Sequence, residues 1–130
     1  MPEVIQPEGW PRPTGFSHGM AATGRVVAVA GQIGAGPDGR LVPGGLPAEL
    51  DQALANVTAV LAAAGGGFED VVSMTIYVRD RAAYIAARPA LGEVWRRRAG
   101  RHYPAICLVE VSGLYDERAL VEVQALAVLP

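Results

Sequence analysis

The 130-residue sequence contains no lysine, so all 11 of its cationic side chains are arginine. The absence of lysine excludes Schiff-base catalysis, covalent attachment of pyridoxal phosphate and phosphate binding by a P-loop lysine. A single cysteine, Cys107, excludes an internal disulfide and a cysteine-rich zinc site. Two histidines, His18 and His102, are too few for a histidine-rich metal cage. We therefore expect neither a bound metal nor a cofactor.

Other features are scarce as well. The formal net charge is −2, so the chain lacks the basic field that a nucleic-acid partner requires. The longest apolar stretches, at residues 26–30 and 57–64, fall short of the roughly 20 residues of a membrane span, so no membrane partner is expected. The proline-rich N-terminus does not resemble a signal peptide. These absences favour a cytoplasmic protein, and an apolar fraction of 51% is enough to fill the core of one domain.

The first half of the chain predicts short strands followed by a long helix. Residues 1–15 are proline-rich and are expected to be an irregular lead-in, followed by a short edge strand at 16–22. The β-branched run at 26–30 lies between Gly24 and Gly31 and predicts a buried strand. Apolar residues then recur every three or four positions from Leu46 to Ala64, which predicts an amphipathic helix with Pro47 in its first turn.

The second half alternates between strand and helix patterns. Residues 71–78 predict a strand whose apolar face carries Val72, Met74, Ile76 and Val78. Asp80 caps a second helix that runs to about Arg98, and Pro89 must lie in its first turn or split it. Two further strands follow at 105–111 and 119–128. The order β-β-α-β-α-β-β predicts one α+β domain over residues 1–130, a two-layer sandwich with a mixed, mostly antiparallel sheet and both helices on one face.

The sheet face opposite the helices is predicted to be mixed in character. It would carry Ser73, Thr75, Tyr77, Glu122 and Gln124 beside apolar Ile106 and Leu108. Such a face is typical of a subunit interface with ligand pockets. Cys107 would then point to the other face as a small buried hydrophobe. The arginines at 96–98 and Arg101 are interpreted as a solvated helix end, His102 as loop surface, and His18 as a structural hydrogen-bonding residue.

Several motifs, taken in order, resemble the YjgF/RidA family of reactive-intermediate deaminases, also called endoribonuclease L-PSP. The resemblance covers nearly the whole chain, and its pieces are Thr14-Gly15-Phe16-Ser17-His18, Val29-Ala30-Gly31-Gln32-Ile33, the helical pair Gln52 and Asn56, Asp70-Val71-Val72 with Ile76-Tyr77-Val78 and Asp80, Pro104-Ala105, and Val121-Glu122-Val123-Gln124-Ala125-Leu126-Ala127. The resemblance implies a homotrimer of chorismate-mutase-like subunits with a small-molecule cleft between neighbours. It also implies hydrolysis of enamines and imines to 2-oxo acids and ammonia.

Within this resemblance, the position after Pro-Ala carries an arginine that binds the substrate carboxylate, and a glutamate on the last strand positions or activates water. Here Ile106 stands in place of that arginine, whereas the glutamate is retained as Glu122. The family tyrosine is Phe16 and the family asparagine of the second helix is Arg88. The candidate catalytic residue is Glu122, and the candidate substrate-binding residues are Phe16, Ala30, Gly31, Arg88, Ala105 and Ile106.

Three functions stay open at this point. The first is a divergent enamine or imine deaminase with weak or no activity on 2-aminoacrylate, since isoleucine does not bind a carboxylate. The second is a trimer that binds a small metabolite without turnover, and Glu122 is then an exposed strand residue or part of a rim ion pair. The third is an endoribonuclease, which ranks last because no histidine pair, metal cluster or basic groove supports RNA cleavage. We further expect Arg88 either to take over anion binding at the cleft or to be an unpaired surface residue.

Overall fold

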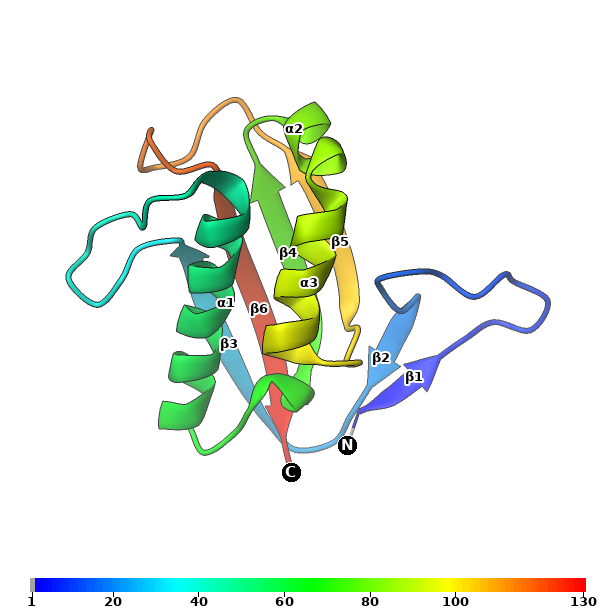
Figure 1. Ribbon diagram of the computed structural model, residues 1–130. Coiled ribbons are helices and arrows are strands. Elements are labelled where there is room, and N and C mark those ends of the chain that lie inside the picture. Colours follow the sequence, from blue (N-terminus) through cyan, green and yellow to red (C-terminus); the bar gives the residue numbers. More distant parts are fainter. Residues whose placement is uncertain (1) are drawn as a thin grey trace.

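A computed structural model describes residues 2–130 and is built on a four-stranded sheet with the order β3-β6-β4-β5 (Figure 1). β3 (Arg25–Ile33) and β4 (Val71–Val78) both pair antiparallel with β6 (Val121–Leu129). β5 (Ala105–Glu110) pairs parallel with β4. Helices α1 (Gly45–Ala63) and α3 (Arg88–Ala99) lie side by side over one face of the sheet. The α+β two-layer fold, with its mixed sheet and one-sided helices, is confirmed.

The N-terminal segment is more ordered than its proline content indicates. β1 (Glu3–Ile5) and β2 (Gly19–Ala21) form a separate antiparallel pair beside the main sheet (Figure 1). The expectation of an irregular lead-in over 1–15 is therefore wrong at β1. The main-chain hydrogen bonds of β1 are made to β2, whose position the chain reaches only after a 13-residue connection, and local composition does not reveal such pairing.

The two predicted helices form, and the second one is divided. Asp80 caps α2 (Arg81–Ala86), since its Oδ1 accepts a hydrogen bond from the Ala83 amide at 3.0 Å. Pro89 lies in the first turn of α3, where the missing amide proton has no helical partner to lose. The predicted second helix is therefore split into α2 and α3 just before Pro89, which is one of the two outcomes expected for this proline. A short 3₁₀ turn, η1 (Phe68–Asp70), follows α1.

The core lies between the sheet and the helices. Val121, Val123, Ala125 and Ala127 of β6 are all buried there, as their alternation predicts. In β4, a register irregularity between Val71 and Ser73 changes the alternation. Val71 is buried and Val72 is only partly so, which reverses the prediction at that pair because a bulge shifts one residue to the other face.

The sheet face opposite the helices is uncovered and carries several apolar side chains. Val26 is 61% exposed and Leu126 41% exposed, and Val29 alone of the run 26–30 is buried, so the prediction of a fully buried strand is wrong. Register places Ile106 beside Met74 and Leu108 beside Ile76, on the helix side. Cys107 lies beside Thr75 and is exposed. The predicted faces of these three β5 residues are thus exchanged, because the sequence does not give the register of β5.

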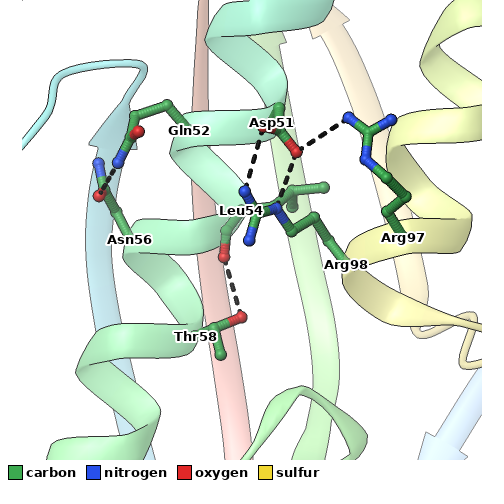
Figure 2. Close-up of polar contacts among 7 residues, drawn as sticks. All are labelled: Asp51, Gln52, Leu54, Asn56, Thr58, Arg97 and Arg98. Carbon is green, nitrogen blue, oxygen red and sulfur yellow. Dashed lines mark hydrogen bonds and ion pairs between the residues drawn. The ribbon is translucent and has the colours of Figure 1, made fainter.

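The Gln52–Asn56 pair ties α1 to the end of β3. The Gln52 amide donates to Asn56 Oδ1 at 2.8 Å (Figure 2). The Asn56 amide in turn donates to the carbonyl oxygens of Ile33 at 3.1 Å and Ala35 at 2.8 Å. These bonds satisfy backbone groups where the strand leaves the sheet, so the pair has a structural role.

The arginines of α3 include a bridge to α1. Arg98 binds Asp51 through two bonds, Nε to Oδ1 at 2.8 Å and Nη2 to Oδ2 at 3.1 Å (Figure 2). Arg97 approaches the same carboxylate at 3.3 Å. Arg96, Arg97 and Arg98 are all exposed, so the prediction of a solvated helix end is confirmed, and the ion pairs with Asp51 are an additional contact that the sequence pattern does not show. The hydrogen bond from Arg98 is the main reason that the pKa of Asp51 lies below its usual value.

Candidate functional site

A cavity of about 550 Å³ lies between α3 and β5, on the helix side of the sheet. That size is typical of a site for a small molecule. The cavity brings together three candidate residues from distant parts of the sequence, Phe16, Arg88 and Ile106. Its other lining residues are Thr14, Gly15, Leu50, Ile76, Tyr84, Leu91, Gly92, Trp95, Tyr103 and Leu108.

Arg88 is positioned by the break between α2 and α3. As the first residue of α3, it precedes Pro89 and donates from Nε to the Ile85 carbonyl oxygen at 3.3 Å. Among residues 2–130, no hydrogen bond or ion pair engages its two terminal nitrogens. Arg88 lines the cavity and is also exposed to solvent, and the two terminal NH2 groups of its guanidinium are available to a bidentate anion.

Trp95 and Tyr103 form the floor of the cavity, where aromatic contacts and a hydrogen bond hold them. The Trp95 indole N–H donates to the His102 carbonyl oxygen at 3.1 Å, and the Trp95 ring stacks on Tyr103 with centroids 6.1 Å apart. Phe68 meets the Trp95 ring edge-on at 5.4 Å. His102 is half-buried and its Nε2 lies 2.7 Å from the Val71 carbonyl oxygen, so the prediction that it is loop surface is wrong. Burial raises the pKa of the Tyr84 hydroxyl, which stays neutral.

Phe16 is held at the cavity mouth by the residue that follows it. Ser17 Oγ donates to the Tyr103 carbonyl oxygen at 2.5 Å, and the Ser17 amide donates to the Pro104 carbonyl oxygen at 3.0 Å. The His18 ring meets both Phe16 and Trp10 edge-on, with centroids at 5.5 and 5.0 Å. His18 is therefore placed by aromatic contacts rather than by the hydrogen bond expected of it.

Glu122 lies in a different place, on the uncovered sheet face. It lines a shallow pocket of about 370 Å³ together with Gly31, Tyr77, Val111, Gly113, Leu114, Tyr115 and Gln124. The Tyr77 hydroxyl donates to Gln124 Oε1 at 2.9 Å. Tyr77 of β4 is paired with Glu122 of β6, so this hydrogen bond lies beside the Glu122 side chain. A Cβ atom at position 31 would lie 1.9 Å from Glu122 Oε2, so the carboxylate occupies the space above Gly31.

The seven candidate residues therefore fall into separate groups. Phe16, Arg88 and Ile106 share the helix-side cavity, whereas Gly31 and Glu122 share the pocket on the opposite face. Ala105 lines a smaller pocket with Phe16, Ile106 and Cys107. Ala30 is exposed in the irregular part of β3, between Val29 and Gln32. A single chain does not gather all seven into one site.

Much of the cavity wall is formed by residues that the sequence analysis does not predict as site residues. Tyr84, Leu91, Trp95 and Tyr103 were not singled out, although each lines the cavity. The spacing of four between Leu91 and Trp95 places both on one helical face, and this spacing could have identified them as neighbours in the cavity wall.

Within residues 2–130, no group of three or more histidine, cysteine, aspartate or glutamate side chains is arranged to hold a metal ion. Nor does any helix in that range have the length and apolarity to cross a bilayer.

Comparisons with known proteins agree over nearly the whole chain. A RutC family protein of Pyrococcus horikoshii is 34% identical over 128 residues, 98% of each chain. A 2-iminobutanoate/2-iminopropanoate deaminase of Capra hircus is 35% identical over 105 residues, which cover 80% of this chain and 73% of that protein. The crystal structure of YyfB from Yersinia pestis, a protein of unknown function of the conserved Rid protein family, superposes with a TM-score of 0.86 at 33% identity, covering 98% of both chains.

Residues 11–129 match the family model of Endoribonuclease L-PSP. This match spans both the helix-side cavity and the Glu122 pocket, and it agrees with the relatives above in sequence and in fold. The chain belongs to the Endoribonuclease L-PSP family, whose relatives include the Rid and RutC proteins.

Proposed function

We propose that this protein is a homotrimeric Rid-type hydrolase of imines or enamines that bear a carboxylate, with Arg88 as the residue that binds the carboxylate. The observation that carries the proposal is that Arg88 and Ile106 line the same cavity. The cation that the resemblance places on the strand is missing at Ile106. Arg88 supplies a cation to the same space from the helix side.

The surroundings of Arg88 favour an anionic ligand. Its terminal nitrogens have no partner among residues 2–130, and a guanidinium binds a carboxylate through two parallel hydrogen bonds. Arg88 also begins a helix of 12 residues, and free amides and the helix dipole at that end attract negative charge. Arg88 approaches the cavity from the helix, whereas the arginine of the family resemblance approaches from the strand. The substrate carboxylate is therefore held in a different place, so we expect weak or no activity on 2-iminopropanoate.

Glu122 is the proposed catalytic residue. Water adds to the C=N carbon while the carboxylate accepts a proton from that water; proton transfer to nitrogen then releases ammonia and leaves a 2-oxo acid. One C–N double bond is replaced by a C–O double bond, and water supplies the oxygen. No metal or cofactor is needed for this step.

The proposed assembly brings Glu122 to the substrate. Arg88 and Glu122 lie on opposite sides of the sheet within one chain, so a complete site requires Glu122 from a neighbouring subunit. Exposed Val26 and Leu126 on the same face as Glu122 favour association, because apolar side chains lose contact with water on burial. A mass of about 41 kDa, three times 13.6 kDa, is expected in light scattering, and a mass near 13.6 kDa at micromolar concentration contradicts the trimer.

Two alternatives make different predictions. If the assembly leaves Glu122 away from the cavity, the protein binds its ligand without turnover. An RNA substrate is the least favoured, because a net charge of −2 does not attract a polyanion.

The decisive experiment measures 2-oxo acid release from imines that an amino-acid oxidase generates from amino acids with side chains of different size, and separately measures carboxylate binding. Arg88→Ala should weaken carboxylate binding at least tenfold, since a lost charge-assisted hydrogen bond typically costs about 1.5–3 kcal/mol. Glu122→Gln should retain binding and lose turnover. Arg96→Ala, an exposed arginine of the same helix, is the matched control and should change neither. Binding without any acceleration by the unmodified protein favours the binding alternative, and binding unaffected by Arg88→Ala contradicts the proposal.

A further inference from the structure

We infer that the ligand of the helix-side cavity is a 2-imino acid with a bulky, branched or aromatic apolar side chain, rather than a three-carbon acid. This inference deepens the proposed function and rests on it for the carboxylate at Arg88. It concerns the part of the ligand that extends beyond Arg88 into the cavity.

Apart from the hydroxyl groups of one threonine and two tyrosines, the side chains around that space offer apolar surface. Arg88 is the one charged residue of the lining within residues 2–130. The indole N–H of Trp95 is already bonded to the His102 carbonyl oxygen, so the indole has no free donor to offer a ligand. Leu91 and Leu108 add aliphatic surface to the same lining. A ligand with one anionic end and one apolar body is complementary to this distribution of charge.

The size of the cavity points the same way. Its volume of about 550 Å³ lies within the range of about 300–1,000 Å³ that is typical of pockets for drug-sized ligands. A pyruvate-sized ligand at Arg88 would leave exposed Phe16 and half-buried Ile106 and Leu108 in contact with water. A larger apolar side chain removes that surface from water and gains packing contacts.

Gly92 provides an independent observation. It lies within α3 and lines the cavity, in a helix interior where glycine is among the least favourable residues. A Cβ atom at this position would meet only the Arg96 guanidinium, at an ordinary distance of 3.7 Å, so protein packing does not require glycine here. The missing side chain keeps space open beside Arg88, one helical turn away.

The experiment compares binding of 4-methyl-2-oxopentanoate and pyruvate by calorimetry, in the unmodified protein and in two variants. Gly92→Leu fills the wall of the cavity, and Ala90→Leu adds the same side chain to an exposed position of α3 outside the lining. We expect the six-carbon acid to bind at least tenfold more tightly than pyruvate, because even one methylene in an apolar pocket is worth about tenfold or more. Gly92→Leu should remove this preference, and Ala90→Leu should retain it.

The Gly92→Leu variant is expected to fold, since it replaces glycine in a helix, and circular dichroism checks this directly. Equal affinities for the two acids, no detectable binding of either, or an unchanged preference in Gly92→Leu would each overturn the inference. Turnover of imines generated from leucine and from alanine by an amino-acid oxidase separates the two proposals. Selective binding without acceleration defeats the proposed function alone, whereas equal acceleration of both imines, without selective binding, defeats only the ligand class.

Discussion

The carboxylate of Glu122 lies over the backbone of Gly31, so close that a Cβ atom there would be 1.9 Å from Oε2. The two residues come from neighbouring strands, β3 and β6, whose register is irregular at this point. Gly31 thus provides the space in which the side chain of Glu122 lies. Both residues belong to the motifs that carry the family resemblance, and their proximity gives a physical reason for glycine at position 31.

Gly31→Ala should displace Glu122 without unfolding the protein. The contacting atom is the end of a flexible side chain, so the carboxylate moves aside, and a shift of about 1 Å at a reacting group lowers the rate by roughly a hundredfold. Imine hydrolysis and thermal unfolding, measured on the same sample, check this. In the double variant Gly31→Ala with Glu122→Ala, the loss of rate should equal that of Glu122→Ala alone; a further loss would mean that Gly31 acts independently of Glu122.

Asn56→Leu should destabilise the fold by about 1–3 kcal/mol, because the carbonyl oxygens of Ile33 and Ala35 lose their hydrogen-bond donor. Urea denaturation measures the change. Thr58→Ala, on the same helix, is the matched control: its hydroxyl donates only to the Leu54 carbonyl oxygen one turn earlier, and a change within about 0.5 kcal/mol is expected. A cost for Asn56→Leu no greater than that of the control would show that the Gln52–Asn56 pair does not hold the end of β3.

Asp51→Asn should remove a contribution to stability that depends on pH. The hydrogen bond from Arg98 lowers the pKa of Asp51 below 3.8, so the folded protein binds fewer protons there than the unfolded chain. The contribution is present above that ordinary value and is lost as the pH falls through the lower, folded pKa. We expect the variant to be less stable at neutral pH by about 0.2–1 kcal/mol, as for other solvent-exposed ion pairs. Urea unfolding from pH 3 to pH 7 tests this, and a difference independent of pH would contradict the role of the charge.

Glu49 should show the opposite dependence. Burial raises its pKa above 4.5, and nearby Asp116 adds to the effect, although the hydrogen bond from the Leu120 amide to Oε1 opposes it. The folded state then binds more protons than the unfolded state, so the stability from this group is complete at low pH and declines as the pH rises through the folded pKa. Glu49→Gln should lack that decline, because its side-chain oxygen still accepts the Leu120 amide. Unfolding curves should show that the stability of the variant rises relative to that of the unmodified protein between pH 4 and pH 7.

Val26→Asp should separate the subunits of the proposed trimer. Val26 is 61% exposed in the single chain, so a surface substitution there should change the stability of the subunit by only about 0.5 kcal/mol. An aspartate buried between subunits is unfavourable. Light scattering should show the mass falling to 13.6 kDa. Val60→Asp, at a 38% exposed position on α1, is the control and should leave the mass unchanged. An assembly that tolerates Val26→Asp would place the interface elsewhere.

Local patterns predicted the helices and strands well because each depends on neighbours in sequence. The alternation in β6 and the three- and four-residue spacing of α1 both describe surfaces packed against one core, and both proved correct. The faces of Ile106 and Cys107 were exchanged because they depend on the register of β5 against β4, a pairing made across α2 and α3. The bulge near Val72 and the pairing of Arg98 with Asp51 likewise depend on segments that are far apart in the sequence.

The candidate site was predictable to a smaller extent. Motif resemblance singled out Phe16, Arg88 and Ile106, and the fold gathers them around one cavity. The aromatic floor was not predicted, since Trp95 and Tyr103 lie on separate elements and their stacking follows from how α3 meets the turn before β5. The separation of Glu122 from Arg88 depends on which side of the sheet each occupies, and a list of motifs carries no such information.

The strand order β3-β6-β4-β5 also bears on how the protein is made. β6 is the last strand in the sequence but lies between β3 and β4 in the sheet, so β3 has no strand partner until residues 121–129 have been synthesised. At a synthesis rate of about 5–20 residues per second, the 96 residues between the ends of β3 and β6 take roughly 5–20 s to add. During that time the apolar residues of β3, and the edge of β4 that will receive β6, are open to other chains. Because an unpaired strand edge is a template for pairing with another chain, association between chains competes with folding until β6 is in place.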